Sequence, residues 1–382
     1  MKIFIASDSY KGCMSSREAN YRIEKGIHKA DPQAKCSSFC ISDGGEGFVE
    51  AFAQAFQARV EKAEAHDLYG RPLTVSYAWQ PERKTVCVEA ASVLGLTLYP
   101  RPSRRPMEAS SHGLGQLCAK LIRELSPQQV VIGLGGTGTN DGGMGFLGAF
   151  GARFYDRSRH LLRPSAQNLS KIAFIDKREF SFPASVQFVA ACDVSNPFIG
   201  ENGATHVFGR QKGLRPFQIA GVEKAMSWFC AKIDQTFHVN LNAYPGAGAA
   251  GGLGGMLGAV FDARIESGIR LLASGSRMIE EIQDADLVIT GEGQSDEQSA
   301  NGKAVAQIGK MASQYDKPVV VISGALSTGY EKLYDLGIDA LFSTADRAMS
   351  FSQALKSGPE KLEAQAENIM RLLQAAERIY RR

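Results

Sequence analysis

The sequence lacks the P-loop motif G-x-x-x-x-G-K-[ST], in which backbone N–H groups and a lysine bind the phosphates of a nucleotide. It contains two Gly-Lys pairs, Gly302-Lys303 and Gly309-Lys310, and both lack the upstream glycine and the following serine or threonine. If the chain binds nucleotide phosphates, it does so without this motif.

Motifs for zinc binding and for two kinds of hydrolysis are also absent. The sequence has no C-x-x-C pair, no H-E-x-x-H and no G-x-S-x-G elbow. Its seven cysteines are scattered and odd in number, which is typical of buried free thiols in a reducing compartment. We therefore expect a cytoplasmic protein without a cysteine or histidine metal site.

Charge of one sign and long hydrophobic runs are scarce. The formal net charge is +3, and basic residues form no patch that would indicate nucleic-acid binding. Residues 239–261 carry no charge, but they include Pro245 and many glycines and lack the large apolar residues of a membrane span. The apolar segment after Met1 is too short for a signal peptide. We expect neither nucleic-acid nor membrane partners.

The chain is long and rich in glycine. Its 382 residues exceed the roughly 250–300 that one hydrophobic core supports, so two domains are expected. Hydrophobic residues make up 44% and charged residues 22%, as in ordinary globular proteins. The 40 glycines exceed the average and cluster, which indicates sites lined by backbone.

Short apolar segments that end in Gly, Ser or Asp predict the strands of an α/β fold. Continuous Val/Ile-rich runs are typical of parallel or mixed sheets covered on both faces. Ligands in such sheets bind beyond the carboxyl ends of the strands, so polar residues there are the main site candidates. The segments are residues 3–6, 39–41, 130–134, 188–192, 287–289 and 319–322.

Three further segments have recognisable patterns. Residues 59–90 look like antiparallel ribbons broken by turns, which suggests that a second domain begins near residue 60. Ser15 followed by Glu18 predicts a capping box at the start of a helix. Residues 359–382 have a helical period and predict a closing surface helix.

Two glycine-rich segments, residues 133–143 and 246–251, contain G-x-G-x-x-G. Two matches in one chain show that the dinucleotide fingerprint has little specificity here. Tandem glycines at the start of a helix expose backbone N–H groups that bind anions. The alternative is that the glycines serve only tight turns.

Acids and lysines recur at the predicted strand ends and in glycine-bounded loops. Phosphoryl transfer needs groups that bind phosphate, carboxylates for magnesium and a base for the acceptor hydroxyl. A single acid after a strand is often just a helix N-cap, but five such positions together favour a site. The acids are Asp8, Asp43, Asp193, Glu292 and Asp296, and the lysines are Lys11, Lys212 and Lys303.

Seven ordered blocks of sequence resemble the glycerate kinase family, and the resemblance spans nearly the whole chain. The first three are Asp8-Ser9-Tyr10-Lys11-Gly12, Asp43-Gly44-Gly45-Glu46-Gly47 and the run from Gly135 to Gly143. The others begin at Ala191, Phe208, Pro245 and Ile289. The sequence departs from the family's usual residues at a few positions, among them Ser7, Phe48 and Gln294.

The resemblance implies a function and a fold. The function is ATP-dependent phosphorylation of D-glycerate, on the 2-hydroxyl to give 2-phosphoglycerate, with Mg²⁺. The fold has two α/β domains with the active site in the cleft between them. One domain is flavodoxin-like with a parallel sheet and comprises residues 1–60 and 255–382; the other is an inserted mixed α/β domain, residues 61–254. Whether the chain forms a homodimer stays open.

Roles within the site follow as a hypothesis. One of the acids accepts the hydroxyl proton, and Asp193 is the first choice because Asn196-Pro197 makes its turn rigid. The catalytic set is Asp193, Asp8, Lys11 and Asp43, and the metal ligands are Asp43 and Asp296. The nucleotide-binding set is Gly135, Gly136, Thr137, Thr139, Asn140, Asp141, Lys212, Gly291, Glu292 and Lys303.

Two alternative functions remain at this point. A G-x-G-x-x-G match is also what a nucleotide-dependent dehydrogenase of a small hydroxy acid would have. A non-catalytic α/β protein that binds sugar acids would tolerate the departures from the family pattern. Release of ADP, or a change in nicotinamide absorbance, distinguishes these functions.

Overall fold

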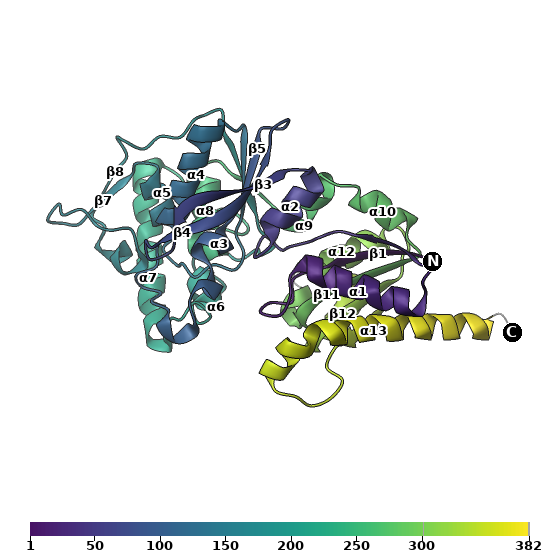
Figure 1. Cartoon of the computed structure of the whole chain (residues 1–382). Helices are drawn as coiled ribbons and strands as arrows, with labels where there is room; N and C mark the ends of the chain where they lie inside the picture. Colours follow the sequence, from purple (N-terminus) through teal and green to yellow (C-terminus); the bar gives the residue numbers. More distant parts are fainter. Residues whose placement is uncertain (301, 381–382) are drawn as a thin grey trace. The chain divides into compact units, whose positions relative to one another are not determined.

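The computed structural model describes residues 1–300 and 302–380, and the chain forms two compact units (Figure 1). Unit 1 comprises Met1–Asp43, Gln54–Phe56 and the chain from Ile269 onward. Unit 2 comprises Gly44–Ala53 and Gln57–Gly268. The domain boundaries expected from the sequence, near residues 60 and 254, stay a prediction.

Unit 1 is built on a sheet of five parallel strands: β1 (Lys2–Ser7), β2 (Lys35–Ser38), β11 (Leu287–Ser295), β12 (Val319–Leu326) and β13 (Ala340–Ser343). Their order is β13-β12-β11-β1-β2. Counted along this unit, that is the order 2-1-3-4-5 of flavodoxin-like sheets. The expected flavodoxin-like parallel sheet is confirmed.

Helices cover both faces of this sheet. Successive residues of β1 point to opposite faces, so Ile3 and Ile5 pack on one side and Phe4 on the other. The helices α1 (Ser16–Ala30) and α13 (Phe351–Tyr380) cover the first side and lie side by side in Figure 1. The other elements of this part of the chain are α9 (Gly268–Ser274), α10 (Met278–Asp284), α11 (Glu297–Ala300), α12 (Ala304–Ser313) and the 3₁₀ helix η4 (Tyr330–Leu336), of which α10 and α12 pack on the second side.

The start of α1 is close to the prediction. Ser15 is its N-cap, and the Ser15 hydroxyl accepts a hydrogen bond of 3.2 Å from the backbone N–H of Glu18. The Glu18 carboxylate, however, accepts a bond from Arg22 at 3.1 Å, one turn further along the helix. Half of the expected capping box is therefore formed.

The closing helix begins earlier than predicted. The sequence pattern placed its start at Pro359, but α13 begins at Phe351 and Pro359 lies inside it. Proline has no N–H to donate to the carbonyl four residues before it, that of Leu355. This carbonyl instead accepts a bond of 3.1 Å from the Cys13 thiol, so the helix tolerates the proline. Residues 381 and 382 of the predicted helix lie outside the described residues.

The prediction of a strand at residues 39–41 was wrong, because the strand begins four residues earlier, at Lys35. The strand is β2, and Phe39 and Ile41 follow it. Since β2 is an edge strand, its own residues are half-exposed and only weakly apolar. Ile41 is 1% exposed because it packs in the core after the strand has ended. The Phe39 N–H still donates to the Ile5 carbonyl of β1 at 3.0 Å, so the hydrophobic run begins at the end of the strand and continues into the core.

Unit 2 contains a mixed sheet of six strands in the order β10-β9-β6-β5-β4-β3. β3 (Arg59–His66), β4 (Pro72–Gln80) and β5 (Thr85–Glu89) pair antiparallel, which confirms the ribbons predicted between residues 59 and 90. β6 (Gln129–Gly133), β9 (Gln187–Ala191) and β10 (Arg264–Glu266) extend the sheet from β5 in parallel. A separate antiparallel pair is formed by β7 (Arg153–Tyr155) and β8 (Phe174–Asp176).

One hydrophobic core holds unit 2 together, and packed rings of Phe146, Phe188 and Phe261 lie within it. None of the described helices is long and apolar enough to cross a membrane. The remaining helices are α2 (Phe48–Phe56), α3 (Ala90–Leu94), α4 (His112–Leu125), α5 (Met144–Ala149), α6 (Ala204–Phe208), α7 (Pro216–Phe237) and α8 (Ala249–Val260), with the 3₁₀ helices η1 (Leu96–Leu98), η2 (Arg101–Ser103) and η3 (Ala166–Lys171).

Candidate active site

Unit 1 contains a cavity of about 420 Å³ near the carboxyl ends of its strands. The neighbouring strands β1 and β11 both contribute to it, and the helices α1 and α12 that follow them pack on opposite faces of the sheet. In a sheet of order 2-1-3-4-5 this is the topological switch point, where ligands bind. Six predicted site residues line one part of the cavity, which we call the acidic end: Asp8, Lys11, Asp43, Glu292, Asp296 and Lys303.

Asp8 is the most perturbed acid of the acidic end. It follows β1 directly, its backbone N–H donates to the carbonyl of Gly291 at 2.8 Å, and it is 7% exposed. Burial and then the nearby charge of Asp43 raise the pKa of the Asp8 carboxyl well above its usual range, while Lys11 opposes them. The Lys11 Nζ lies 3.8 Å from an oxygen of Asp43. Two acids and one lysine therefore share a small volume.

Glu292 and Asp296 form the other side of the acidic end. Glu292 lies within β11 and is 7% exposed, and the Ser295 hydroxyl donates to it at 2.9 Å. Burial raises the pKa of the Glu292 carboxyl, and hydrogen bonds and the charge of Lys303 lower it again. The Lys303 Nζ lies 3.7 Å from an oxygen of Asp296. This side therefore has a buried carboxyl group, Glu292, beside a half-buried pair of Asp296 and Lys303.

Gly291, predicted to bind nucleotide, has a structural reason to be glycine. It lies in β11 between β1 and β12. A Cβ atom at this position would lie 2.1 Å from the carbonyl oxygen of Ile322 and 2.5 Å from the hydroxyl of Tyr10. No side chain fits there.

The cavity also has apolar lining residues, which the sequence did not predict. Phe351, Ala354 and Leu355 come from the first turns of α13, and Ala325 from the end of β12. Phe351 is 78% exposed although its ring is large and hydrophobic. We call this part the apolar end.

In unit 2, the glycine-rich segment follows β6 as predicted, and Asp141 holds it in place. Its carboxylate is fully buried and accepts bonds from the Ser111 N–H at 2.7 Å, the Ser111 hydroxyl at 2.9 Å, the Gly145 N–H at 3.1 Å and the Gly143 N–H at 3.2 Å. Burial raises the pKa of Asp141, and these donors lower it. Because its oxygens are already satisfied, Asp141 orders the loop from within.

Lys212 connects two parts of the same loop. Its side chain is 3% exposed, and its Nζ donates to the Thr137 hydroxyl at 3.1 Å and to the Thr139 carbonyl at 2.8 Å. Burial lowers the pKa of Lys212 to about 7, although the charge of Asp141 opposes this shift. The ammonium group therefore gains and loses its proton near neutral pH.

The two glycine-rich segments pack on each other. The Gly142 N–H donates to the carbonyl of Gly251 at 3.0 Å. A Cβ atom on Gly251, whose φ is +69°, would lie 2.1 Å from the carbonyl oxygen of Thr139. The glycines of the second segment are thus needed for close packing. The Asn140 side chain is buried and donates to the Thr205 hydroxyl at 3.1 Å, whereas its carbonyl oxygen has no partner among the described residues.

Asp193 lies at the same edge of the unit 2 sheet as this loop. It follows β9, which pairs in parallel with β6, and it is half-buried. The turn after it is fixed because the Asn196 carbonyl accepts a bond of 2.9 Å from Gly248. The predicted rigid turn is therefore present, and it rests against the second glycine-rich segment.

Glu89 is a candidate that sequence reasoning missed. It ends β5, next to the end of β6, and its carboxylate accepts a bond of 3.1 Å from the N–H of Val49 in the first turn of α2. Burial raises the pKa of Glu89 to about 7, although backbone N–H groups of α2 oppose this shift. The signal was available, since Glu89 follows an apolar run as Asp8 does.

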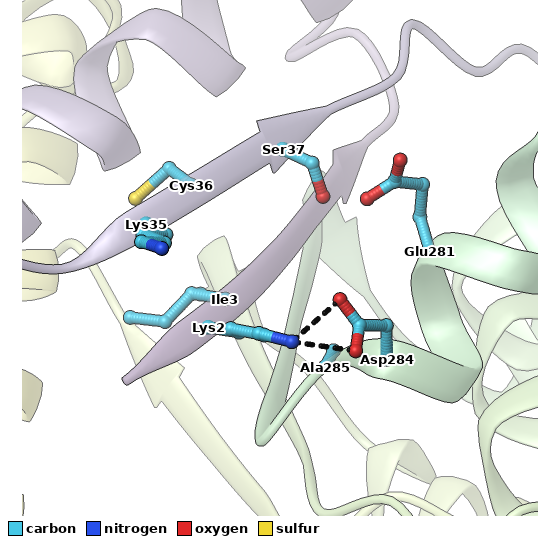
Figure 2. A pocket seen from close by; sticks show the side chains of 8 residues that line it. All are labelled: Lys2, Ile3, Lys35, Cys36, Ser37, Glu281, Asp284 and Ala285. Atoms are coloured by element: carbon cyan, nitrogen blue, oxygen red, sulfur yellow. Dashed lines mark hydrogen bonds and ion pairs between the residues drawn. The ribbon is translucent and has the colours of Figure 1, made fainter.

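A second cavity of unit 1, of about 360 Å³, lies at the opposite end of the strands (Figure 2). In Figure 2 the ammonium group of Lys2 points to the carboxylate of Asp284, at 2.6 Å, and both side chains are exposed. Exposed ion pairs of this kind contribute little to the free energy of unfolding. Cys36 also lines this cavity, and it belongs to a group with Glu24 and His28 whose ligand atoms lie within 4.8 Å of one another. No predicted site residue lies here.

The fold and the clustered acids and lysines define an α/β protein equipped for phosphoryl transfer without a P-loop. Residues 3–374 match the model of the glycerate kinase family. The chain belongs to the glycerate kinase family.

Named relatives agree with this placement along their whole length. The chain is 36% identical to a glycerate kinase of Halalkalibacterium halodurans over 96% of this chain and 97% of that protein. It is 36% identical to the glycerate 2-kinase of Escherichia coli, with 97% of each covered. A solved structure of a Salmonella typhimurium protein described as a glycerate kinase 2 has a TM-score of 0.80 and 34% identity, with 99% of each chain covered. These relatives support neither alternative function.

Proposed function

We propose that this chain transfers the terminal phosphoryl group of ATP to the 2-hydroxyl of D-glycerate, giving 2-phosphoglycerate and ADP. Its family membership and the similarity to a glycerate 2-kinase support this reaction. The observation that carries the proposal is the acidic end, where four carboxyl groups and two lysines meet at the switch point of a flavodoxin-like sheet. Phosphoryl transfer depends mainly on positioning and on neutralising charge, and such a cluster supplies both.

Mg²⁺ fits the acidic end by the chemistry of its donors. Carboxylate oxygens are the ligands that this ion takes from proteins. Asp8 lies beside Asp43, and burial followed by the charge of Asp43 raises the pKa of Asp8. Asp43 and Asp296 are the residues that would hold the ion. When bound, Mg²⁺ neutralises charge on the phosphate oxygens of ATP.

The lysines and the glycine-rich loop are assigned to anions. Lys11 and Lys303 line the cavity with their charged ends beside carboxylates, and they are placed to bind phosphate oxygens. In unit 2, Gly136 follows β6 and is the residue of this pair whose backbone N–H we assign to an anion, because the Gly135 N–H donates to the Gly44 carbonyl at 2.9 Å. Lys212 shapes that loop through its bonds to Thr137 and Thr139, and it carries more positive charge as pH falls through about 7.

One carboxylate accepts the proton of the glycerate 2-hydroxyl while the new O–P bond forms and ADP leaves. Asp193 remains our first choice, and the fixed turn after it supports this role. Asp8 is the second choice, because a carboxyl group with a raised pKa is a stronger base than an ordinary one.

Release of ADP in a coupled assay across small hydroxy acids tests the function. We expect ADP release with D-glycerate, and NMR of the product should show phosphate on the 2-oxygen. A product phosphorylated on the 3-oxygen would correct the position. No ADP release with any hydroxy acid, or oxidation of the acid with a nicotinamide, would overturn the proposal.

Compartment and assembly are also proposals. All seven cysteines belong to the described residues and are free thiols, which supports a reducing, cytoplasmic compartment. A homodimer stays a prediction, and light scattering coupled to gel filtration would measure it.

A further inference from the structure

The apolar end of the unit 1 cavity has a composition that glycerate does not need. Each of the three carbons of glycerate bears oxygen, so the molecule has no face to place against Ala325, Phe351, Ala354 and Leu355. The cavity volume of about 420 Å³ lies in the range of roughly 300–1,000 Å³ that takes larger ligands. A ligand with an apolar part, besides glycerate, would explain these apolar lining residues.

A nucleotide combines both chemistries in one molecule. Its polyphosphate suits lysines and metal-binding carboxylates, and its flat base suits an aromatic ring and small apolar side chains. The cavity has the first kind of group at the acidic end and the second kind at the apolar end.

Phe351 has the position of a stacking platform. It is the first residue of α13, lines the cavity and is 78% exposed. What distinguishes Phe351 from other exposed rings is that it lines the cavity together with Ala354 and Leu355, so a bound ligand would cover it. Close approach of α13 is maintained at Gly358, where a Cβ atom would lie 2.5 Å from the Cys13 sulfur.

We propose that the adenine ring of ATP binds at the apolar end, stacked on Phe351 beside Leu355, with its phosphates directed to the acidic end. This inference rests on the proposed function for the identity of the nucleotide. It makes Phe351 a determinant of nucleotide affinity.

Calorimetric titration with two probes tests this inference, using the full chain. ADP carries both base and phosphates, whereas tripolyphosphate carries phosphates alone. For Phe351→Ala we expect ADP to bind roughly 5- to 100-fold more weakly, which is the effect of removing one stacked aromatic ring. Tripolyphosphate should bind as it does to the wild type. Phe351→Trp should restore ADP binding to within a few-fold, because it keeps a ring.

A matched control is Phe217→Ala. Phe217 is 77% exposed on α7 of unit 2, so its truncation removes the same exposed ring outside the cavity. We expect ADP binding to equal that of the wild type. In turnover assays, Phe351→Ala should raise the KM for ATP and leave the KM for glycerate within about twofold.

Unchanged ADP binding by Phe351→Ala, equal loss of both probes, or a rise only in the KM for glycerate would overturn the inference. So would a wild-type chain that binds no ADP. Failure of the proposed function looks different: the wild-type chain would bind ADP in the Phe351-dependent way and yet phosphorylate no glycerate.

Discussion

Three carboxyl groups near strand ends share one physical feature at the scale of residues. Asp8, Glu292 and Glu89 each lie at or near the carboxyl end of a strand, and burial raises the pKa of each. Burial is the main cause of all three pKa shifts, but the groups that surround each carboxyl differ. Asp8 has a neighbouring acid, Glu292 has serine hydroxyls, and Glu89 has the start of a helix.

Asp193→Asn tests the choice of base. If Asp193 accepts the hydroxyl proton, kcat should fall by about 10²- to 10⁴-fold, the usual contribution of general base catalysis. ADP binding, followed by calorimetry, should be retained. Ser195→Ala, a change in the same exposed turn, is the control and should turn over normally. Near-wild-type kcat for Asp193→Asn would remove it from the mechanism and leave Asp8 as the candidate.

Asp43→Asn tests the electrostatics of the acidic end. The negative charge of Asp43 raises the pKa of Asp8, so its removal should move the titration of the Asp8 carboxyl to lower pH. Lys11→Met removes a charge that lowers this pKa, so it should move the titration to higher pH. Carboxyl ¹³C NMR measures both. Shifts of the same sign in the two variants would contradict the arrangement.

Glu89 links pH to stability. Its folded pKa of about 7 lies above the unfolded value of 4.5, so its contribution is fully present below pH 4.5 and is lost as pH rises through about 7. Relative to Glu89→Gln, which stays neutral, the wild type should lose up to about 3 kcal/mol of unfolding free energy over this window. Urea unfolding at pH 5 and pH 8 measures it. A constant difference between the two proteins would show that Glu89 ionises normally.

At the scale of elements, the contact between α1 and α13 in unit 1 depends on one glycine. α1 and α13 approach so closely at Gly26 that a Cβ atom there would lie 2.1 Å from the carbonyl oxygen of Glu363. The Glu363 carboxylate, 5% exposed, accepts ion pairs from Arg22 at 3.3 Å, Lys25 at 3.2 Å and Lys29 at 2.5 Å, all on α1. Both features hold the two helices in one register.

Gly26→Ala should separate these helices and destabilise the chain by about 1–3 kcal/mol, as overpacking does. Gly221→Ala is the matched control. Gly221 lies in α7, and no atom of the residues that the structure describes comes within 4 Å of an added Cβ atom, so the change should stabilise by about 0.5–1 kcal/mol through helix propensity. Urea unfolding compares the two. Equal effects would show that the close approach at Gly26 does not matter.

Elements were predictable where local pattern and tertiary role agree. The ribbons from residue 59 and the parallel strands β1, β6, β9, β11 and β12 have apolar patterns that match their burial. β2 was misplaced because an edge strand needs few apolar residues. The start of α13 was misplaced because the Cys13 thiol, distant in sequence, satisfies the carbonyl that Pro359 leaves open.

For the whole molecule, each unit has a core of its own. The acids and lysines that line the cavity could be predicted, since each lies directly after a strand or beside a glycine. The apolar end could not be predicted, because Phe351 and Leu355 are distant from Asp8 in the sequence and line the same cavity only in the folded chain. The role of Asp141 was also out of reach, because its partner Ser111 lies 30 residues away.

Separate cores predict two transitions in calorimetric unfolding. ADP should raise the temperature of one of them, since a ligand that binds only the folded state stabilises it. Gly26→Ala should lower the temperature of that same transition, because Gly26 and the cavity both belong to unit 1. If the variant lowers one transition and ADP raises the other, the nucleotide does not bind in unit 1.

Pro359 divides α13 into two parts with separate duties. Residues before it face the cavity, whereas Leu362, Ala366, Ile369 and Met370 after it pack in the core. Pro359 interrupts the backbone hydrogen bonding between these two parts, because it has no N–H to donate. If the nucleotide binds where we propose, substitutions among the cavity residues of α13 should change nucleotide preference, while the core residues of its second part keep the helix in place.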